Sequence, residues 1–274
     1  MRIACLLKFV PDTDNLVYND EGKLLWREKM ELTLNPDDSS ALAWALALRK
    51  SGADGEIEID ALSMAPPKVA DAARDLLRIG TDRFFLISDP LFAGSDTLAT
   101  SRVLVRGITM REAEAGRYDL ILCGTRSLDG DTSHIPAQIA ALLGRPVITG
   151  VYRLSLAEAE GQATAETDDE DSVFTWGLRL PAVAGFVRRR DLRLPFVRYA
   201  DLDKDVDDRL YRLSNAALGL KPEETGLAGS RTRVERTFAK TLPAKKQTVV
   251  YGSGESAAQV LALLRENGFP AEVA

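Results

Sequence analysis

The sequence predicts an α/β fold built on a doubly wound, mostly parallel β-sheet. Two observations lead to this prediction. Short apolar segments at residues 2–9, 57–64 and 83–87 have the length of buried strands, and helical patterns separate them. Strands that alternate with helices form parallel sheets, because each helix carries the chain back across the sheet to the start of the next strand. A chain of 274 residues, 45% of them hydrophobic, is long enough to bury such a core.

Prolines and glycines indicate where the helices begin and end. Asn35 and Pro36 are typical of a helix start, with Asn35 as the N-cap and Pro36 in the first turn, and Gly52 marks the end of that helix. Further helical patterns cover residues 66–80, 96–115, 133–143 and 255–267. Further apolar segments typical of strands cover residues 120–123, 181–187 and 248–251.

Two predicted hairpins depart from this alternation, and a polar segment comes after it in the chain. Residues 16–18 and 24–26 flank a turn signal and predict a hairpin. Residues 151–156 and 173–180 flank a polar stretch and predict a β-hairpin insertion. From residue 196 to about 246 the chain is polar, and residues 225–230 (TGLAGS) have the composition of a flexible linker. We therefore expect an α/β domain over residues 1–195 and an extension over residues 196–274.

Composition excludes several classes of function. The net charge of −6 opposes nucleic-acid binding, which needs a basic face. No apolar run approaches the roughly 18 residues of a membrane span, so we expect no membrane insertion. The two cysteines, Cys5 and Cys123, lie in expected core strands and give no disulfide framework, which fits a reducing cytoplasm. His134 is the only histidine, which leaves little material for a metal site or a catalytic triad.

The richest candidate site is the loop GTRSLDGDT at residues 124–132, which follows an expected strand and leads into an expected helix. Open parallel sheets bind ligands beyond the carboxyl ends of their strands, and free N–H groups at a helix start suit a phosphate. Asp129 and Asp131 would repel a phosphate, so we expect them to shape the loop or to contact a ribose or base. The same spacing also fits a purely structural role, in which Asp131 or Thr132 caps the helix.

Other side chains at strand ends have two interpretations each. Lys8, at the end of the first strand, either meets a phosphate or carboxylate or is simply solvated. His134 either contacts the ligand or is a surface or capping residue. The basic cluster of Arg188, Arg189, Arg190 and Arg193 is either a docking patch for an acidic partner or cofactor phosphate, or a solvated charge run. Residues 252–256 (GSGES) resemble an anion-binding turn and equally fit helix capping.

Six segments, in order and with matching spacing over residues 1–205, resemble the β subunits of electron transfer flavoproteins. They are LLKFVPDT (6–13), LNPDD (34–38), AARDLLRIGTDR (72–83), LDGDT (128–132), RLPAV (179–183) and RYA (198–200). The resemblance implies an adenine-nucleotide α-hydrolase-like fold, with a C-terminal arm that wraps around a partner subunit. The expected subunit is an electron carrier rather than a stand-alone enzyme.

In this family a larger α subunit supplies most of the site for the FAD that shuttles electrons between dehydrogenases and reductases. The β subunit holds AMP, or in electron-bifurcating members a second FAD that takes hydride from NADH. The resemblance thus implies an α-subunit partner and an acyl-CoA dehydrogenase-like or quinone-reductase-like redox partner. The motif DGDT (129–132) is commoner in bifurcating members and favours FAD, whereas His134 and Pro136, which replace the usual glutamine and glycine, oppose it.

The resemblance also implies which residues contact the nucleotide and which recognise the partner. Carried over motif by motif, and joined with Lys8 and Gly130 from the same segments, the nucleotide contacts are Leu6, Lys8, Asn35, Met64, Ser127, Asp129, Gly130, Asp131, Thr132, Ser133, His134 and Ile135. The partner-recognition loop is expected near residues 198–204, at Arg198, Tyr199 and the apolar anchor Leu202. Two segments depart from the family pattern: residues 167–172 in the hairpin, and residues 205–220 in place of a lysine-rich segment.

Two alternative functions remain open. A stand-alone adenine-nucleotide-binding sensor or adenylating protein would need a phosphate loop such as Ser-Gly-Gly-x-Asp-Ser after the first strand, where this chain has KFVP. A scaffold subunit that keeps the fold and binds nothing is the other, since the hairpin motif is altered. The nucleotide extracted from the chain, alone and with an α-type subunit, distinguishes the three functions.

Overall fold

The structure, a computed structural model, describes residues 1–12, 30–52, 56–156, 161–169, 171–233 and 256–269. The chain divides into two compact units, Met1–Glu235 and Arg236–Ala274. The second contains helix α7, Ser256–Glu266, where the sequence predicts a helix. The hairpin predicted over residues 16–26, the strand predicted over 248–251 and the start of the turn at 252–256 lie outside the described residues.

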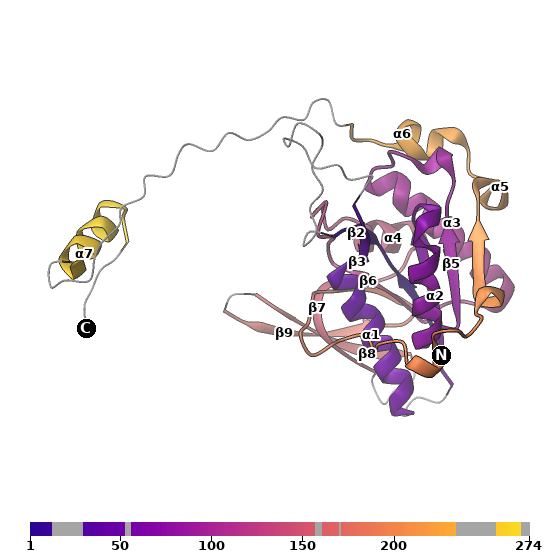
Figure 1. The fold of residues 1–274 in the computed structure, drawn as a ribbon, viewed down its shortest axis with the longest axis horizontal. Coiled ribbons are helices and arrows are strands. Elements are labelled where there is room, and N and C mark those ends of the chain that lie inside the picture. The colour runs from indigo at the N-terminus through magenta and orange to yellow at the C-terminus, as the bar shows by residue number, and fades with distance from the viewer. Residues whose placement is uncertain (13–29, 53–55, 157–160, 170, 234–255, 270–274) are drawn as a thin grey trace. The chain divides into compact units, whose positions relative to one another are not determined.

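The first unit is built on a nine-stranded sheet, which confirms the predicted fold class (Figure 1). Its strand order is β11-β5-β4-β1-β6-β10-β7-β8-β9. In this order the strands are Leu210–Leu213, Arg83–Ile87, Glu58–Met64, Arg2–Leu6, Leu120–Gly124, Ala182–Phe186, Val147–Leu156, Gln162–Asp168 and Val173–Arg179. Pairing is parallel from β11 to β7 and antiparallel beyond β7.

Strand β1 is the point at which the direction of winding reverses. The chain passes from β1 to β4 and β5 on one side, and then returns to β6 on the other side of β1. The crevice beyond the carboxyl ends of such strands is the usual ligand site of a doubly wound sheet. The fold therefore places a candidate site beyond the ends of β1 and β6.

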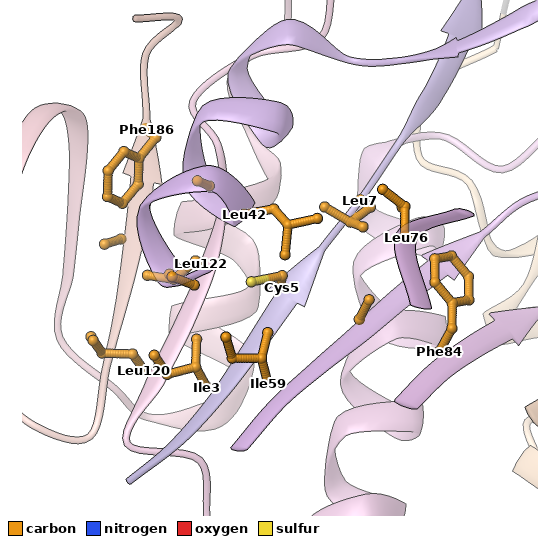
Figure 2. Packing of buried hydrophobic residues seen from close by; sticks show 14 of the residues in the cluster. Ile3, Cys5, Leu7, Leu42, Ile59, Leu76, Phe84, Leu120, Leu122 and Phe186 are labelled. Carbon is orange, nitrogen blue, oxygen red and sulfur yellow. The ribbon is translucent and has the colours of Figure 1, made fainter. Parts of the chain in front are cut away.

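Helices cover both faces of the sheet. They are α1 (Pro36–Ser51), α2 (Ala70–Ile79), α3 (Thr97–Ala115) and α4 (Ile135–Leu143). Alternate residues of β1 enter two separate apolar clusters, because successive side chains of a strand point to opposite faces. Ile3 and Cys5 pack with the α1 and α2 side, as Figure 2 shows, whereas Ala4 and Leu6 pack with the α3 and α4 side.

The first predicted strand and the first predicted helix differ from expectation in detail. Residues 2–9 do not form one strand: β1 ends at Leu6, and Phe9–Pro11 forms β2, which pairs antiparallel with β3, Leu32–Leu34. Beyond the end of β1, the N–H of Lys8 donates to the Asp38 carboxylate. Asn35 occupies the N-cap position of α1, but its side chain makes no capping hydrogen bond.

The predicted two-stranded insertion contains a third strand. The segments 151–156 and 173–180 do not pair with each other, because β8 lies between them and pairs antiparallel with both β7 and β9. The inward residues of β8 are only Ala163 and Ala165. Such small side chains give a weak alternating pattern among polar neighbours, which explains why the sequence did not indicate this strand.

Residues 196–233 belong to the first unit. Strand β11 joins the edge of the main sheet beside β5. The prediction of a flexible linker at residues 225–230 is wrong, because Thr225, Gly226 and Gly229 are buried and Gly226–Gly229 forms a short helix, α6. A Cβ on Gly226 would overlap the carbonyl oxygen of Leu91, so this glycine permits a close backbone approach. The boundary at residue 195 and a partner contact over 196–274 stay predictions.

None of the described helices is long and apolar enough to cross a membrane.

Truncation of Leu42 tests the packing of α1 on the sheet. This side chain is fully buried, and Leu42→Ala is expected to lower the free energy of unfolding by about 2–5 kcal/mol through lost burial and a residual cavity. Leu142→Ala, on the exposed face of α4, is the matched control and should cost less than about 1 kcal/mol. Urea denaturation measures both, and equal losses would contradict the assignment of Leu42 to the core.

Candidate functional site

A cavity of about 450 Å³ lies at the carboxyl ends of β1, β4 and β6. Its walls come from these strand ends, the start of α1, the loop after β6, and the start of α3. Ten of the twelve expected nucleotide contacts line it: Leu6, Lys8, Asn35, Met64, Ser127, Gly130, Thr132, Ser133, His134 and Ile135. Cys123 also lines the cavity.

The other two expected contacts, Asp129 and Asp131, do not line the cavity. Asp129 accepts from Lys8 Nζ at 2.6 Å, and Lys8 Nζ also lies 3.1 Å from Ser127 Oγ. Although burial raises the pKa of Asp129, the Lys8 ammonium holds it below the ordinary value, so this carboxylate stays ionised. Asp131 is exposed and lies 3.5 Å from the Arg126 guanidinium. Asp129 thus shapes the loop by holding Lys8 at the cavity wall.

Two buried carboxylates in the first turn of α1 hold the loops around the cavity. Asp38 accepts from the backbone N–H of Lys8 at 2.8 Å and from the backbone N–H of Gly124. Asp37 accepts from the N–H of Arg126 at 3.3 Å and from the N–H of Arg188 at 2.9 Å. The loops that follow β1, β6 and β10 therefore meet on one helix start.

Two neighbouring side chains complete this contact. The Asn35 amide donates to the carbonyl of Arg126 at 2.8 Å and accepts from the N–H of Leu128 at 3.0 Å, so it fixes the loop from both sides. Ser40 Oγ accepts from the N–H of Arg189 at 2.9 Å. We call Asn35, Asp37, Asp38 and Ser40 the α1 clamp.

Burial controls the protonation of the α1 clamp. Desolvation raises the pKa of Asp38 to about 7, although the N–H groups of Lys8 and Gly124 oppose this shift. Desolvation also raises the pKa of Asp37. A carboxylate removed from water is costly unless hydrogen bonds satisfy it, so these N–H donors are part of what lets the acids stay buried.

Sequence reasoning missed the opposite wall, at the start of α3. Asp96 caps α3 by accepting from the N–H of Ala99, and its other oxygen accepts from Thr232 and Arg231. Ser95, Asp96, Thr97, Thr100, Leu104 and Thr232 line the cavity here. The N-cap pattern at Asp96 after the strand at 83–87 was the available signal for the helix start, whereas no local pattern indicates that residue 232 returns to it.

The segment before α4 has an unusual backbone. Neither Asp131 nor Thr132 caps the helix, since α4 begins at Ile135 and His134 occupies the N-cap position. Asp131 and Ser133 have φ of 49° and 56°, in the left-handed region that residues with a Cβ rarely adopt. Such conformations cluster at ligand sites, where the surrounding structure maintains them.

The remaining candidates lie outside the cavity or are inert. Burial raises the pKa of Cys5 and of Cys123 well above the ordinary thiol value, so neither is a ready nucleophile. The Arg189 guanidinium pairs with Asp191 at 2.8 Å and lies 5.3 Å above the Tyr152 ring.

The expected recognition residues do not line the cavity. Tyr199 is 92% exposed, Leu202 is 46% exposed, and Arg198 pairs with Asp201 at 2.6 Å. Phe196, which sequence reasoning did not single out, is 95% exposed.

Gly124 tests the close contact between β6 and the α1 clamp. A Cβ at this position would lie 2.6 Å from Asp37 Cβ and 2.7 Å from Asp38 Oδ1. Gly124→Ala is therefore expected to lower the free energy of unfolding by about 1–3 kcal/mol. In the control, Gly177→Ala on β9, the new methyl meets nothing within 4 Å. If chemical denaturation finds the two variants equally stable, the contact is not as tight as described.

The raised pKa of Asp38 predicts a dependence of stability on pH. Between about pH 4 and pH 7 the folded protein keeps a proton on Asp38 that the unfolded chain has released, so the stabilising contribution is lost as pH rises. The free energy of unfolding of the wild type minus that of Asp38→Asn should fall across this window. Urea titrations at several pH values measure it, and a constant or rising difference would contradict the prediction.

Comparisons with known proteins place this geometry in a family. A family model described as electron transfer flavoprotein domain matches residues 24–188. The chain is 33% identical to the electron transfer flavoprotein subunit beta of Megasphaera elsdenii, over 87% of each chain. It is 32% identical to the caffeyl-CoA reductase-Etf complex subunit CarD of Acetobacterium woodii, over 87% of this chain and 88% of the relative. It is 31% identical to the protein FixA of Azorhizobium caulinodans, over 95% of this chain and 92% of the relative. The chain therefore belongs to the electron transfer flavoprotein family, as a β-type small subunit.

Proposed function

We propose that the cavity holds an adenine nucleotide, either AMP or the adenosine end of a second FAD. We further propose that the subunit, together with an α-type subunit, helps to bind the FAD that shuttles electrons. One observation carries this proposal: Leu6, Asn35, Met64 and several residues of the loop at 127–135 line the same cavity. Its volume of about 450 Å³ falls within the usual range of about 300–1,000 Å³ for small-ligand sites.

The chemistry of the cavity wall fits a nucleotide. Leu6, Met64, Leu104 and Ile135 supply an apolar surface that suits an adenine ring. The hydroxyls of Ser127, Thr132 and Ser133, with the Lys8 ammonium, supply donors for ribose and phosphate oxygens. Because Asp129 pairs with Lys8, the wall carries less net positive charge than the lysine alone would give.

The residues of this chain bind and orient rather than react. A bound FAD supplies the electron chemistry, and the protein sets its position and electrostatic surroundings. Among the described residues of the cavity, the cysteine is buried with a raised pKa and the one histidine has no acidic hydrogen-bond partner. An electron carrier subunit has no need of a side-chain acid, base or nucleophile.

The surface at residues 196–202 supports a role in partner recognition. Phe196 and Tyr199 are almost fully exposed and Leu202 is half-exposed, and exposed apolar clusters commonly mark protein interfaces. We propose that Arg198, Tyr199 and Leu202 contact an acyl-CoA dehydrogenase-like or quinone-reductase-like redox partner, and that the rest of residues 196–274 contacts the α-type subunit. The names of two relatives, a reductase-Etf complex subunit and an acryloyl-CoA reductase electron transfer subunit, agree with assembly into larger complexes.

Extraction of the bound nucleotide tests the proposal. The chain is expressed alone and with an α-type subunit from its own genome, and the nucleotide released on denaturation is identified by chromatography and mass. A yellow heterodimer with one FAD and one AMP, or with two FAD, is expected. A monomer that binds ATP and does not pair would overturn the proposal, and would instead support a stand-alone nucleotide-binding protein.

The ion pair at the cavity wall gives a residue-level prediction. Lys8→Met combined with Asp129→Asn removes the ammonium without leaving an unpaired carboxylate. Loss of a charge-assisted hydrogen bond is worth about 1.5–3 kcal/mol, so AMP or FAD should bind roughly tenfold or more weakly. Lys50→Met, at the exposed end of α1, is the control. Calorimetric titration measures both, and equal affinities would remove Lys8 from the site.

A further inference from the structure

We propose that Thr97 holds His134 as the neutral imidazole whose proton is on Nε2, so that His134 donates a hydrogen bond to an oxygen of the bound nucleotide. Thr97 acts as a positioning residue through its hydrogen bonds to His134 and Gln138. The identity of the ligand rests on the proposed function.

Four side chains from α3 and the start of α4 form one continuous hydrogen-bonded chain. Ser101 Oγ lies 2.9 Å from Gln138 Oε1, and Gln138 Nε2 lies 3.4 Å from Thr97 Oγ1. Thr97 Oγ1 lies 3.2 Å from His134 Nδ1. Thr97 and His134 line the cavity, whereas Ser101 is fully buried behind it.

The buried end of the chain sets the direction of its first two hydrogen bonds. Within the described residues, the Ser101 hydroxyl has Gln138 as its hydrogen-bond partner and no other. A buried hydroxyl that leaves its proton without an acceptor costs about 1–3 kcal/mol. Ser101 therefore donates to Gln138 Oε1, which turns the amide nitrogen of Gln138 toward Thr97.

The third hydrogen bond, between Thr97 and the histidine, is set by the Thr97 proton. Gln138 Nε2 donates to Thr97 Oγ1, and the Thr97 proton is free to donate to His134 Nδ1. A neutral imidazole that accepts at Nδ1 carries its proton on Nε2. If Nδ1–H donated to Thr97 instead, the Thr97 oxygen would accept from both Gln138 and His134, and the Thr97 proton would have no acceptor among the described residues.

This arrangement gives the cavity a neutral donor at a defined place. His134 Nε2 has no hydrogen-bond partner among the described residues, and the ring lines the cavity beside Thr132 and Ser133. An N–H group at this position matches an acceptor oxygen, which a ribose and a phosphate both present. An amine or another N–H of a ligand would find no acceptor at Nε2.

The presence of a single histidine makes the tautomer directly measurable. Long-range ¹H–¹⁵N correlation spectra of the ¹⁵N-labelled full chain contain one imidazole, that of His134. The spectra are recorded at about pH 8.5, above the ordinary range of histidine pKa values. We expect the wild type to show the Nε2–H form alone, and Thr97→Val to show a mixture of both tautomers. Thr97→Ser, which keeps the hydroxyl, should restore the wild-type spectrum.

Binding measurements then test the contact with the ligand. We expect Thr97→Val and His134→Ala to raise the Kd for AMP by roughly three- to tenfold, as the loss of one hydrogen bond would. Thr109→Val, at a half-buried position further along the same helix, is the control and should leave both the tautomer and the Kd unchanged. A parallel titration with adenosine distinguishes the two sources of the acceptor, since an equal change with adenosine indicates the ribose and a change only with AMP indicates the phosphate.

Each outcome supports or overturns a distinct statement. An Nδ1–H tautomer, or a spectrum that Thr97→Val does not change, would overturn the role of Thr97. The expected tautomer with unchanged Kd values in Thr97→Val and His134→Ala would overturn the contact between His134 and the nucleotide. A wild-type chain that binds no nucleotide contradicts the proposed function, and the spectrum still decides whether Thr97 orients His134.

Discussion

The site depends on the first turn of α1, where side chains bind the backbone of loops from three strands. Asp37 and Asp38 accept N–H groups that follow β1, β6 and β10, and Asn35 fixes the loop after β6 from both sides. The order of the sheet makes this possible, because β1, β6 and β10 are neighbours. Burial of the two acids is costly, and hydrogen bonds to the loops offset that cost. The loops and the helix start thus stabilise one another.

Much of the fold follows from local pattern. The alternation of apolar and helical segments predicts the parallel sheet, and Asn35, Pro36 and Gly52 place α1 to within one residue. Local rules do not predict the role of the α1 clamp, because an Asx residue at a helix start ordinarily caps the helix or interacts with its dipole in solvent. Its burial arises only when β6 and β10 close over it. Strand β8 was missed for a related reason, since its inward residues are alanines supported by neighbouring strands.

The candidate site also has one part that local pattern predicts and one part that it does not. Ten expected contacts meet in one cavity because most of them lie at or after the carboxyl ends of β1, β4 and β6, which parallel topology places at one edge of the sheet. The wall at the start of α3 was not predicted, since residue 232 returns to Asp96 through a contact between residues far apart in the sequence. The hydrogen-bonded chain from Ser101 to His134 also joins two helices, and no pattern within either helix indicates it. Local motifs thus predict which residues meet, and tertiary contacts decide how they are oriented.

Hydrogen exchange at individual backbone amides tests most directly whether the α1 clamp organises the site. In the wild type, the amides of Lys8 and Gly124 are expected to exchange slowly, because both donate to the buried Asp38. In Asp38→Ala, exchange at these two amides should accelerate roughly tenfold or more beyond any change at the amides of β5, as loss of about 1.4 kcal/mol of local protection would give. Equal acceleration throughout the sheet, or none at Lys8 and Gly124, would contradict the account.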